Sequence, residues 1–253
     1  MRLTVLGCAG SFPGPDSACS CYLIDAEGFR LLVDFGTGSL SAVQRFAGLY
    51  SLDAILLSHL HGDHMFDACS YVVARRYAPD GPLPKIPLFA PVGAGQRLAA
   101  VYGGNGGPGD ADSLDDVYEF YDLAAGTYQI GPFSVWAERV NHPVETYGLR
   151  IEQGGRSLAY SADSAPCDAL IRLAHNADTF LCEASYLDEM DNPPDLHLTG
   201  REAGEHATKA GVGRLLLTHL VSAWGSEAMT YDAAASAFGG PIDIVRPGMT
   251  YMI

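Results

Sequence analysis

The sequence predicts a mixed α/β fold with strands and helices in both halves of the chain. Short apolar runs of roughly four to eight residues, bounded by glycine, proline or aspartate, are typical of buried strands. Between them lie segments with apolar residues three and four positions apart, which is the spacing of amphipathic helices. Residues 55–60 and 215–220 are each an apolar strand pattern followed by a hydroxyl residue, a histidine and a leucine. This repetition suggests an approximate duplication in which both halves contribute to one site.

The first half of the chain gives strand and helix predictions in close succession. The apolar runs 21–24 and 29–34 flank the turn-like segment 25–28, so they predict a β-hairpin. The strand predicted at 53–57 ends where a group of histidines begins, which places these histidines on the loop after the strand. The other elements predicted in this half are strands at 2–6 and 88–89 and helices at 39–46, 65–77 and 91–102.

The second half is predicted to start with strands and to continue with helices and strands in alternation. Residues 117–161 alternate in the manner of strands around turns at Gly126, Gly131 and Gly154–Gly155. The preceding segment, 103–110, is too rich in glycine for a regular element, and it is a candidate for a flap or for a surface loop. Helices are predicted at 166–174, 200–211 and 229–238, with strands at 179–183, 213–218 and 243–246.

Length and composition indicate one globular domain, residues 1–253. No Pro/Gly/Ser-rich linker divides the 253 residues. Hydrophobic residues make up 48% of the chain and charged residues 18%, which excludes the disordered and fibrous classes. The six cysteines form no paired framework, and the chain opens into a strand pattern without a signal peptide or a long apolar stretch. We therefore expect a cytoplasmic protein with reduced thiols and no membrane span.

The charge of the chain limits the partners to be expected. The formal net charge of −15 opposes binding of duplex or structured RNA, because such binding gains most of its affinity from Lys and Arg. Metal cations would reverse the field locally, so that a compact anionic substrate could bind a positive site within a negative surface. Extended nucleic acid is therefore less favoured than a small substrate, and the oligomer to expect first is a homodimer.

A cluster of metal-ligand side chains directly follows the strand predicted at 53–57. His59, His61, Asp63 and His64 lie within six residues and supply three imidazoles and a carboxylate, the ligand types that zinc favours. His59 and His61 can share one metal while Asp63 and His64 face a second. An isolated histidine is more often a surface or core residue than a ligand, but three histidines with an aspartate in so short a run indicate a metal site.

Four residues cannot fill two coordination spheres, so further ligands have to come from other loops. His142, Asp163 and His219 each follow a predicted strand and are the remaining candidates. Imidazole and carboxylate ligands suit two divalent ions, with zinc as the default and manganese or iron as the alternatives. Asp34 and Glu183 stand at strand ends, where they could orient ligand imidazoles or only bond backbone amides.

The run Ser-His-Leu-His-Gly-Asp-His, residues 58–64, resembles the signature of the metallo-β-lactamase superfamily. A histidine, an aspartate and a histidine follow in the order typical of that family, so the resemblance covers nearly the whole chain. It implies a four-layer αββα sandwich with two metals. The implied ligands are His59, His61 and His142 for one metal, Asp63, His64 and His219 for the other, and Asp163 as a bridge between them.

Shorter motifs resemble one branch of the superfamily, the phosphodiesterases that include tRNase Z and its relatives. These motifs are Leu6–Pro13, Val33–Gly38, Cys182–Ser185 and His197–Ala203. In that branch the histidine of a His-x-Thr element meets the scissile phosphate, and His197 is its counterpart here. Thr199 and Glu202 agree with this, because they form an S/T-x-x-E capping box that places His197 just before a helix N-terminus, where an anion is favoured. A capping role alone, with His197 exposed, is the alternative.

The mechanism expected from this resemblance is attack on phosphorus by a metal-bridging hydroxide. Two metals about 3.5–4 Å apart lower the pKa of a bridging water and clamp the phosphate oxygens during in-line attack. Asp63 would hold or deprotonate this water, and His197 would stabilise the developing anion or protonate the leaving group. These two residues are the candidate catalytic groups.

The substrate expected is a small phosphodiester, most concretely a cyclic nucleotide such as cyclic AMP. Only residues 143–162 separate His142 from Asp163, and the strands predicted there leave no room for the tRNA-gripping arm of tRNase Z. The chain is in this respect similar to class II-like cyclic-nucleotide phosphodiesterases. The alternatives are tRNA 3′ processing, lactone or thioester hydrolysis, and a non-catalytic metal-binding regulatory role. They remain because the same set of metal ligands occurs in proteins with different functions.

Overall fold

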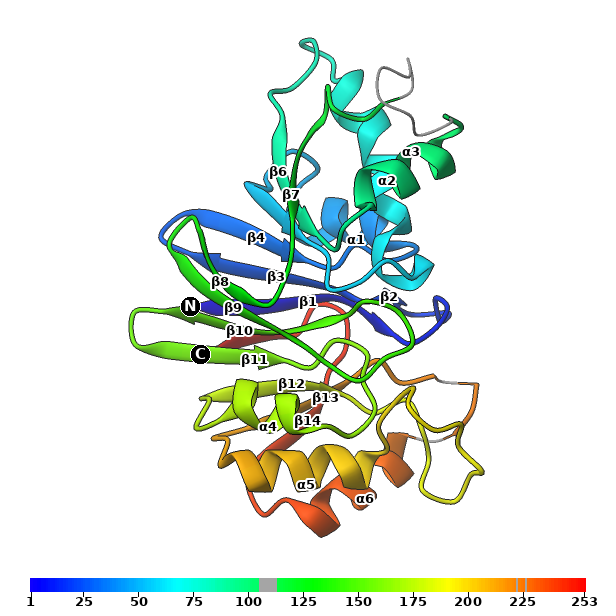
Figure 1. Cartoon of the computed structure of the whole chain (residues 1–253), viewed down its shortest axis with the longest axis vertical. Coiled ribbons are helices and arrows are strands. Elements are labelled where there is room, and N and C mark those ends of the chain that lie inside the picture. The colour runs from blue at the N-terminus through cyan, green and yellow to red at the C-terminus, as the bar shows by residue number, and fades with distance from the viewer. Residues whose placement is uncertain (105–112, 222, 226) are drawn as a thin grey trace.

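The computed structural model describes residues 1–104, 113–221, 223–225 and 227–253. Within them two β-sheets face each other, and helices cover the outer side of each sheet (Figure 1). This is the four-layer αββα arrangement that the sequence predicts. Most of the glycine-rich segment that was expected to form a flap or a surface loop lies outside the described residues.

The elements follow the chain closely. The strands of the first sheet, in spatial order, are β15 (Thr250–Met252), β1 (Arg2–Ala9), β3 (Cys21–Ala26), β4 (Phe29–Val33), β5 (Ala54–Leu56), β6 (Ile86–Ala90) and β7 (Tyr118–Asp122), with β2 (Ala18–Cys19) paired to β1. Those of the second are β14 (Ile242–Ile244), β13 (Leu215–Thr218), β12 (Thr179–Glu183), β11 (Arg156–Tyr160), β10 (Tyr147–Gln153), β9 (Phe133–Arg139) and β8 (Gly126–Ile130). The helices are α1 (Ser39–Phe46), α2 (Gly62–Arg76), α3 (Ala94–Tyr102), α4 (Asp168–Ala174), α5 (Gly200–Ala210) and α6 (Glu227–Ala237).

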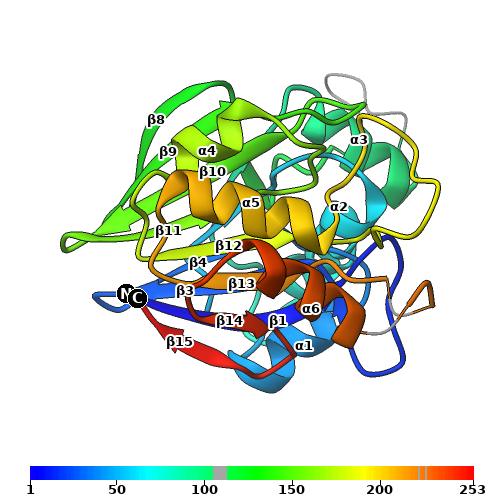
Figure 2. The same ribbon diagram turned by 90° about the horizontal axis from the view of Figure 1, so that it is seen from below.

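Three apolar clusters hold the four layers together. One lies between the sheets, one between the first sheet and α1–α3, and one between the second sheet and α4–α6 (Figures 1 and 2). Strand β4 shows how one strand serves two clusters. Leu31 and Val33 enter the cluster between the sheets, whereas Leu32 packs toward the helices, because successive side chains of a strand point to opposite faces. A strand covered on both faces is therefore continuously apolar.

Parallel strands bring the functional loops to one edge of the sandwich. Strands β4, β5, β6 and β7 run parallel in the first sheet, and β11, β12, β13 and β14 run parallel in the second. The carboxyl ends of parallel strands meet at one edge of a sheet, which is where α/β proteins place their sites. The two termini lie side by side in both ribbon views, because β15 pairs with β1.

The structure corrects the prediction for the histidine run. Helix α2 begins at Gly62 and not at residue 65, so Asp63 and His64 belong to its first turn, and only His59 and His61 precede it. An acidic side chain in the first turn of a helix complements the helix dipole, which favours this earlier start. The short strands β2 and β15 were not predicted, because they exist only through pairing with β1. Within the described residues no helix is long and apolar enough to cross a membrane.

Candidate metal centre

All seven predicted ligands lie together at the edge where the parallel strands end. Their possible ligand atoms form two groups, and within each group these atoms lie within 4.8 Å of one another. The groups are His59, His61, His142 and Asp163, and Asp63, His64, Asp163 and His219. Asp163 belongs to both groups. His59 and His61 thus lie in one group, and Asp63 and His64 lie in the other.

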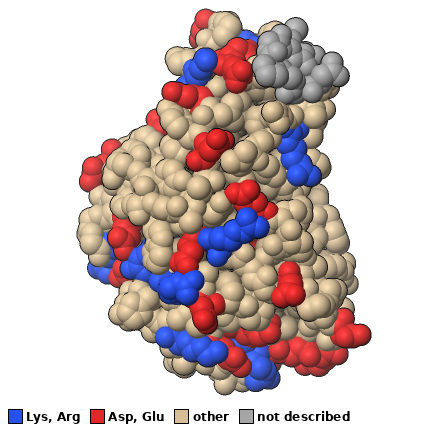
Figure 3. All heavy atoms as spheres, in the orientation of Figure 1, with Lys and Arg blue, Asp and Glu red and all other residues tan. Residues whose placement is uncertain are grey.

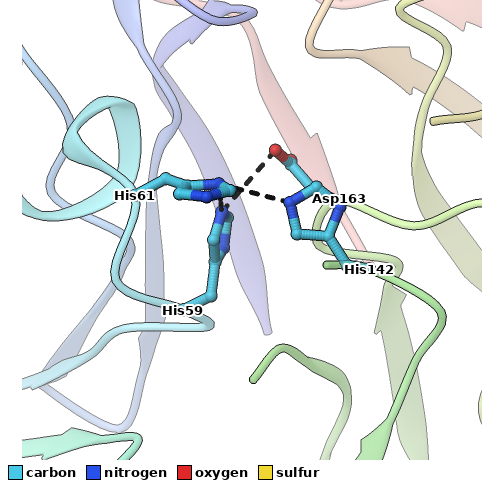
Figure 4. A group of neighbouring side chains, drawn as sticks. All are labelled: His59, His61, His142 and Asp163. Carbon is cyan, nitrogen blue, oxygen red and sulfur yellow. Dashed lines mark hydrogen bonds and ion pairs between the residues drawn. The ribbon is translucent and has the colours of Figure 1, made fainter. Parts of the chain in front are cut away.

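The first group consists of Asp163 and three imidazoles that point toward one another from two loops (Figure 4). Nδ1 of His61 lies 3.2 Å from Nε2 of His59 and 3.2 Å from Nε2 of His142. Oδ2 of Asp163 lies 3.6 Å from Nε2 of His59. His59 and His61 come from the loop before α2, and His142 and Asp163 from loops of the second sheet, so the two halves of the sandwich meet here.

The second group surrounds the other oxygen of Asp163. Oδ1 of Asp163 lies 3.1 Å from Nε2 of His64 and 3.3 Å from Nε2 of His219. These two ring nitrogens are 3.2 Å apart, and Oδ2 of Asp63 lies 3.2 Å from Nε2 of His219. Each oxygen of Asp163 therefore faces a different group.

Contacts behind the rings leave the Nε2 lone pairs of His59 and His64 facing inward. Oδ2 of Asp34 lies 2.7 Å from Nδ1 of His64, so this nitrogen carries the proton. Ser58 donates its hydroxyl proton to the same carboxylate oxygen, at 2.9 Å, and can then only accept a hydrogen bond from Nδ1 of His59, at 3.0 Å. Asp34 thus orients a predicted ligand imidazole, and it also accepts a hydrogen bond from the backbone N–H of Ser58.

The rings of His142 and His219 are held in the same way. Nδ1 of His142 donates to the carbonyl oxygen of Leu196, at 2.9 Å. The hydroxyl of Ser185 donates to Glu183, at 2.9 Å, and accepts from Nδ1 of His219, at 2.8 Å. In the neutral tautomer that these contacts favour, the lone pair of each ring lies on Nε2, which faces its group.

The charges of these residues suit a bound cation. Burial lowers the pKa of His59 far below its usual value, and it also lowers the pKa of His61 and His142. These rings are therefore neutral and can donate a nitrogen lone pair to a metal ion. Burial alone would have the same effect on His64, but the surrounding carboxylates, first of all Asp163, raise its pKa well above the usual value. The field in the second group thus favours positive charge.

The two groups fit divalent metal ions. Nδ1 of His61 lies 3.2 Å from Nε2 of both His59 and His142, and a single proton on His61 cannot serve both contacts, whereas a cation between the three rings can. Oδ1 of Asp163 is buried and accepts no hydrogen bond from the described residues, although two ring nitrogens lie near it. A buried carboxylate oxygen without a hydrogen bond is costly in an ordinary core. Neutral imidazoles and carboxylates are the donors that zinc, manganese and iron accept.

The segment that follows β1, which includes Gly10 and Ser11, contacts Asp63 and His219. The backbone N–H of Ser11 donates to Oδ2 of Asp63, at 3.0 Å. The neighbouring Gly10 lies so close to the last predicted ligand that a Cβ atom there would be 2.4 Å from the carbonyl oxygen of His219. Only glycine permits this approach, which explains part of the Leu6–Pro13 motif.

Strained backbone conformations gather around the centre. Positive φ angles are rare for residues other than glycine. Among the described residues, seven residues other than glycine have a positive φ angle. Four of these seven lie at this edge: Ser11 (62°), Asp34 (58°), Ala162 (52°) and His219 (58°). Such angles cost about 1–3 kcal/mol each and persist only where the surrounding structure imposes them. The fold therefore gives up stability to direct these side chains.

His197 lies beside both groups and is largely buried. Its ring centroid is 5.6 Å from that of His142 and 5.5 Å from that of His219, and its side chain is 8% exposed. The predicted capping box is present, with the Thr199 side chain accepting from the N–H of Glu202. The alternative expected His197 to be exposed, and that part of it is wrong.

A carboxylate controls the charge of His197. Burial lowers the pKa of His197, but Glu183, whose Oε1 lies 2.9 Å from Nδ1, more than offsets this and raises the pKa to about 9. Glu183 also accepts a hydrogen bond from the backbone N–H of Ser164, at 2.7 Å. It was predicted to orient a ligand imidazole or to bond backbone amides. It bonds amides and orients His197, and it reaches the predicted ligand His219 only through Ser185.

Sequence reasoning missed several residues that support the centre. Ser11 and Ser185 lie inside motifs that were noted, but nothing in the motifs indicated their contacts. Tyr160 gave no signal, because it ends an ordinary apolar strand, yet its hydroxyl donates to Oδ2 of Asp34, at 2.8 Å. The carbonyl of Leu196 could not be found from residue type, since every residue has one.

The fold and the His/Asp groups define the class of metal-dependent hydrolases. Residues 29–220 match the family model described as a beta-lactamase superfamily domain. The chain therefore belongs to the metallo-β-lactamase superfamily, as its motifs indicated.

Relatives support this assignment over the full length. An uncharacterized protein of Mycobacterium tuberculosis is 44% identical over 256 positions, which cover 100% of this chain and 92% of that protein. The probable metallo-hydrolase YhfI of Bacillus subtilis is 30% identical over 99% of both chains. Its crystal structure has a TM-score of 0.87 and covers 99% of each chain.

Ribonuclease Z of Mycobacterium bovis is a third relative, 31% identical over 96% of this chain and 95% of that protein. The alignment extends over 274 positions, more than the 253 residues of this chain. Ribonuclease Z therefore contains residues without a counterpart here.

Proposed function

We propose that this protein is a binuclear metal-dependent phosphodiesterase that hydrolyses a small phosphodiester, most concretely a cyclic nucleotide such as cyclic AMP. The observation that carries the proposal is Asp163, whose two oxygens face two separate groups of imidazoles with His197 beside both. Two cations held in this way can bind the oxygens of one phosphate.

The two metal positions would be filled by this chain's own side chains. His59, His61 and His142 would hold one ion, and Asp63, His64 and His219 the other, with Asp163 between them. We propose zinc, with manganese or iron as alternatives, because geometry and donor type alone do not separate these ions. When bound, the ions would lower the pKa of a water molecule and neutralise charge on the phosphate.

Asp63 is the residue proposed to hold the attacking water. In the described part of the chain its polar contacts are made by Oδ2, which accepts from Ser11 and lies near the rings of His64 and His219. These contacts fix the plane of the carboxylate. Oδ1 then remains to accept a proton from water.

His197 is the residue proposed to face the phosphate and the leaving group. Glu183 binds Nδ1, so Nε2 is the atom that can donate a proton. The carboxylate also favours the protonated imidazole. A positively charged donor in this position would stabilise the developing anion and protonate the departing oxygen.

Several features favour a small substrate over a structured RNA. Strands β10 and β11 are joined directly through Gly154 and Gly155, so no arm extends between His142 and Asp163. The net charge is −15, and in Figure 3 the Lys and Arg side chains on this face are dispersed among Asp and Glu. An extended polyanion would lack the basic surface that such binding requires.

Processing of precursor tRNA is the second candidate, and one observation favours it. The identity of 31% with ribonuclease Z extends over 96% of this chain. The short connection between β10 and β11 weakens this candidate, because it leaves no room there for an RNA-binding arm.

The test is hydrolysis of cyclic AMP and of a precursor tRNA by the same purified protein with quantified metal. Chelator-sensitive turnover of cyclic AMP, without cleavage of the tRNA, is the expected result. Cleavage of the tRNA alone would replace the proposal with the second candidate. If neither is cleaved by the metal-loaded protein, phosphodiester hydrolysis is wrong, and lactones and thioesters are the next substrates to assay.

A further inference from the structure

A cavity separate from the metal centre lies where the first and second sheets meet near β1. Its volume is about 580 Å³, within the usual range of small-molecule sites. It lies between the end of α1, the segment 14–17, the start of α6 and the segment 244–247. None of the seven predicted metal ligands lines it, and neither do Glu183 and His197.

The walls of the cavity are mainly apolar, and two aromatic rings stand among them. Phe46 and Trp224 line the cavity and are 39% and 40% exposed, so their rings are accessible. The apolar lining includes Leu187, Leu220, Val221 and Pro247. A planar ring would bury apolar surface against these side chains, and aromatic rings add a preference for stacked or edge-on partners.

Charged groups in the lining specify the polar part of an occupant. Glu227 pairs with Arg246 at 2.5 Å, so these two charges largely satisfy each other. Arg45 and Asp16 also line the cavity, and neither forms an ion pair with a described residue, although the Arg45 guanidinium lies over the Phe46 ring, 5.3 Å from its centroid. An unpaired guanidinium suits a carboxylate, sulfonate or phosphate, and an unpaired carboxylate suits an N–H donor.

The cavity lies directly behind the wall of the metal centre. Ser185 lines it, and the hydroxyl of Ser185 holds both His219 and Glu183. Trp224 stacks on Tyr186, with centroids 6.2 Å apart, and Tyr186 also meets the ring of His197 edge-on, with centroids 5.2 Å apart. An occupant would therefore contact residues one step away from the catalytic side chains without reaching the metals.

From these observations we infer that the cavity is a second small-molecule site, which binds a planar aromatic anion carrying an N–H donor. The ring lies between Phe46 and Trp224, the anionic group binds Arg45, and the donor binds Asp16. The site is independent of the proposed phosphodiesterase activity, since it uses none of the residues assigned to the metals or to proton transfer.

The test is fluorescence titration with 8-anilinonaphthalene-1-sulfonate, which has aromatic rings, one sulfonate and one N–H group. We expect saturable binding of one molecule per chain. Arg45→Glu and Trp224→Ala should each weaken the affinity by roughly tenfold or more, because one loses a charged hydrogen bond and the other an aromatic wall. Both side chains are exposed, so the variants should fold.

Matched controls separate this site from general surface binding. Arg139→Glu makes the same charge change at an exposed arginine outside the cavity, and Tyr77→Ala removes an aromatic ring that is 69% exposed elsewhere. His61→Ala removes a predicted metal ligand. All three should keep the affinity within about twofold of the parent protein. The inference is overturned if the probe shows no saturable binding up to about 1 mM, or if the controls weaken binding as much as the cavity variants.

Discussion

Nδ1 of His197 lies 2.9 Å from Oε1 of Glu183, and this pair joins the edge of the metal centre to strand β12. Glu183 is fully buried, and its other oxygen accepts a hydrogen bond from Ser185, which holds His219. One carboxylate thus orients a proposed proton donor and, through a serine, a proposed metal ligand.

Replacing His197 should lower turnover without removing metal. We expect His197→Ala to reduce kcat by roughly 10²–10⁴-fold, the contribution of an acid/base group. Metal content, measured by elemental analysis, should stay at the wild-type value, because His197 is outside both predicted ligand sets. His175→Ala is the matched control, since that imidazole lies outside the site at the end of α4. Unchanged turnover in His197→Ala would remove His197 from the mechanism.

Neutralising Glu183 should shift the pH dependence of turnover. Glu183 raises the pKa of His197, so the protonated imidazole is present below that pKa and is lost as the pH rises through it. Glu183→Gln removes the charge that favours protonation, and the loss of activity on the alkaline side should therefore occur at lower pH than in the wild type. The measurement is kcat against pH for both proteins. An alkaline limb that does not move would show that His197 does not act as the protonated donor.

Removing a predicted ligand should abolish metal binding and turnover together. His59→Ala and Asp163→Ala each take away a side chain that faces the metal positions. We expect reduced metal content in both and a loss of activity in proportion to it. Asp163→Ala should affect both metals, because its two oxygens face different groups. Wild-type rates in a variant verified to be free of metal would contradict the proposed mechanism.

Asp34 should tune metal affinity from outside the ligand set. It accepts hydrogen bonds from His64, Ser58 and Tyr160, so Asp34→Asn disturbs the orientation of a predicted ligand without deleting one. Changes of this kind typically weaken metal binding by about 10–100-fold, which competition with a chelator can measure. Asp53→Asn is the control, since the Asp53 side chain accepts a hydrogen bond from the backbone N–H of Arg30 and belongs to neither group of ligand atoms. Equal affinities in the two variants would contradict the role given to Asp34.

A carboxylate far from the centre should make stability depend on pH. Burial alone would raise the pKa of Asp178, but hydrogen bonds from Arg156 and Ser157 lower it. This contribution is complete above the pKa of an unfolded aspartate and is lost as the pH falls through the lower folded value. Asp178→Asn should cost about 1 kcal/mol in the free energy of unfolding at pH 7. In denaturant titrations the difference should disappear in acid, and a difference that persists there would exclude the charge as its cause.

Local patterns in the sequence were sufficient for most of the secondary structure. Residues 39–46 have helical spacing, and the helix α1 has these bounds, because its amphipathic pattern and Gly38 define both ends locally. The hairpin of β3 and β4 follows from two apolar runs around a turn. Strand β15 has only three residues and forms by pairing with β1 at the other end of the chain, so no local pattern could predict it.

The sequence also identified the candidate site, because metal chemistry requires specific residue types. Histidines and aspartates at strand ends are few, and their order along the chain resembles one family closely. That order predicted which side chains assemble, and the structure brings all seven into two groups around Asp163.

Only the tertiary structure decided how these side chains are held. The contacts of Ser11 with Asp63, Tyr160 with Asp34 and Ser185 with His219 join residues far apart in the chain. Such contacts depend on how two sheets pack and on where loops approach each other, and the residue types involved are common everywhere. The sequence alone therefore determined the ligand chemistry, since few residue types can bind a metal. The orientation and the charge of each ring were decided by packing, because hydrogen bonds and burial act through space and not along the chain.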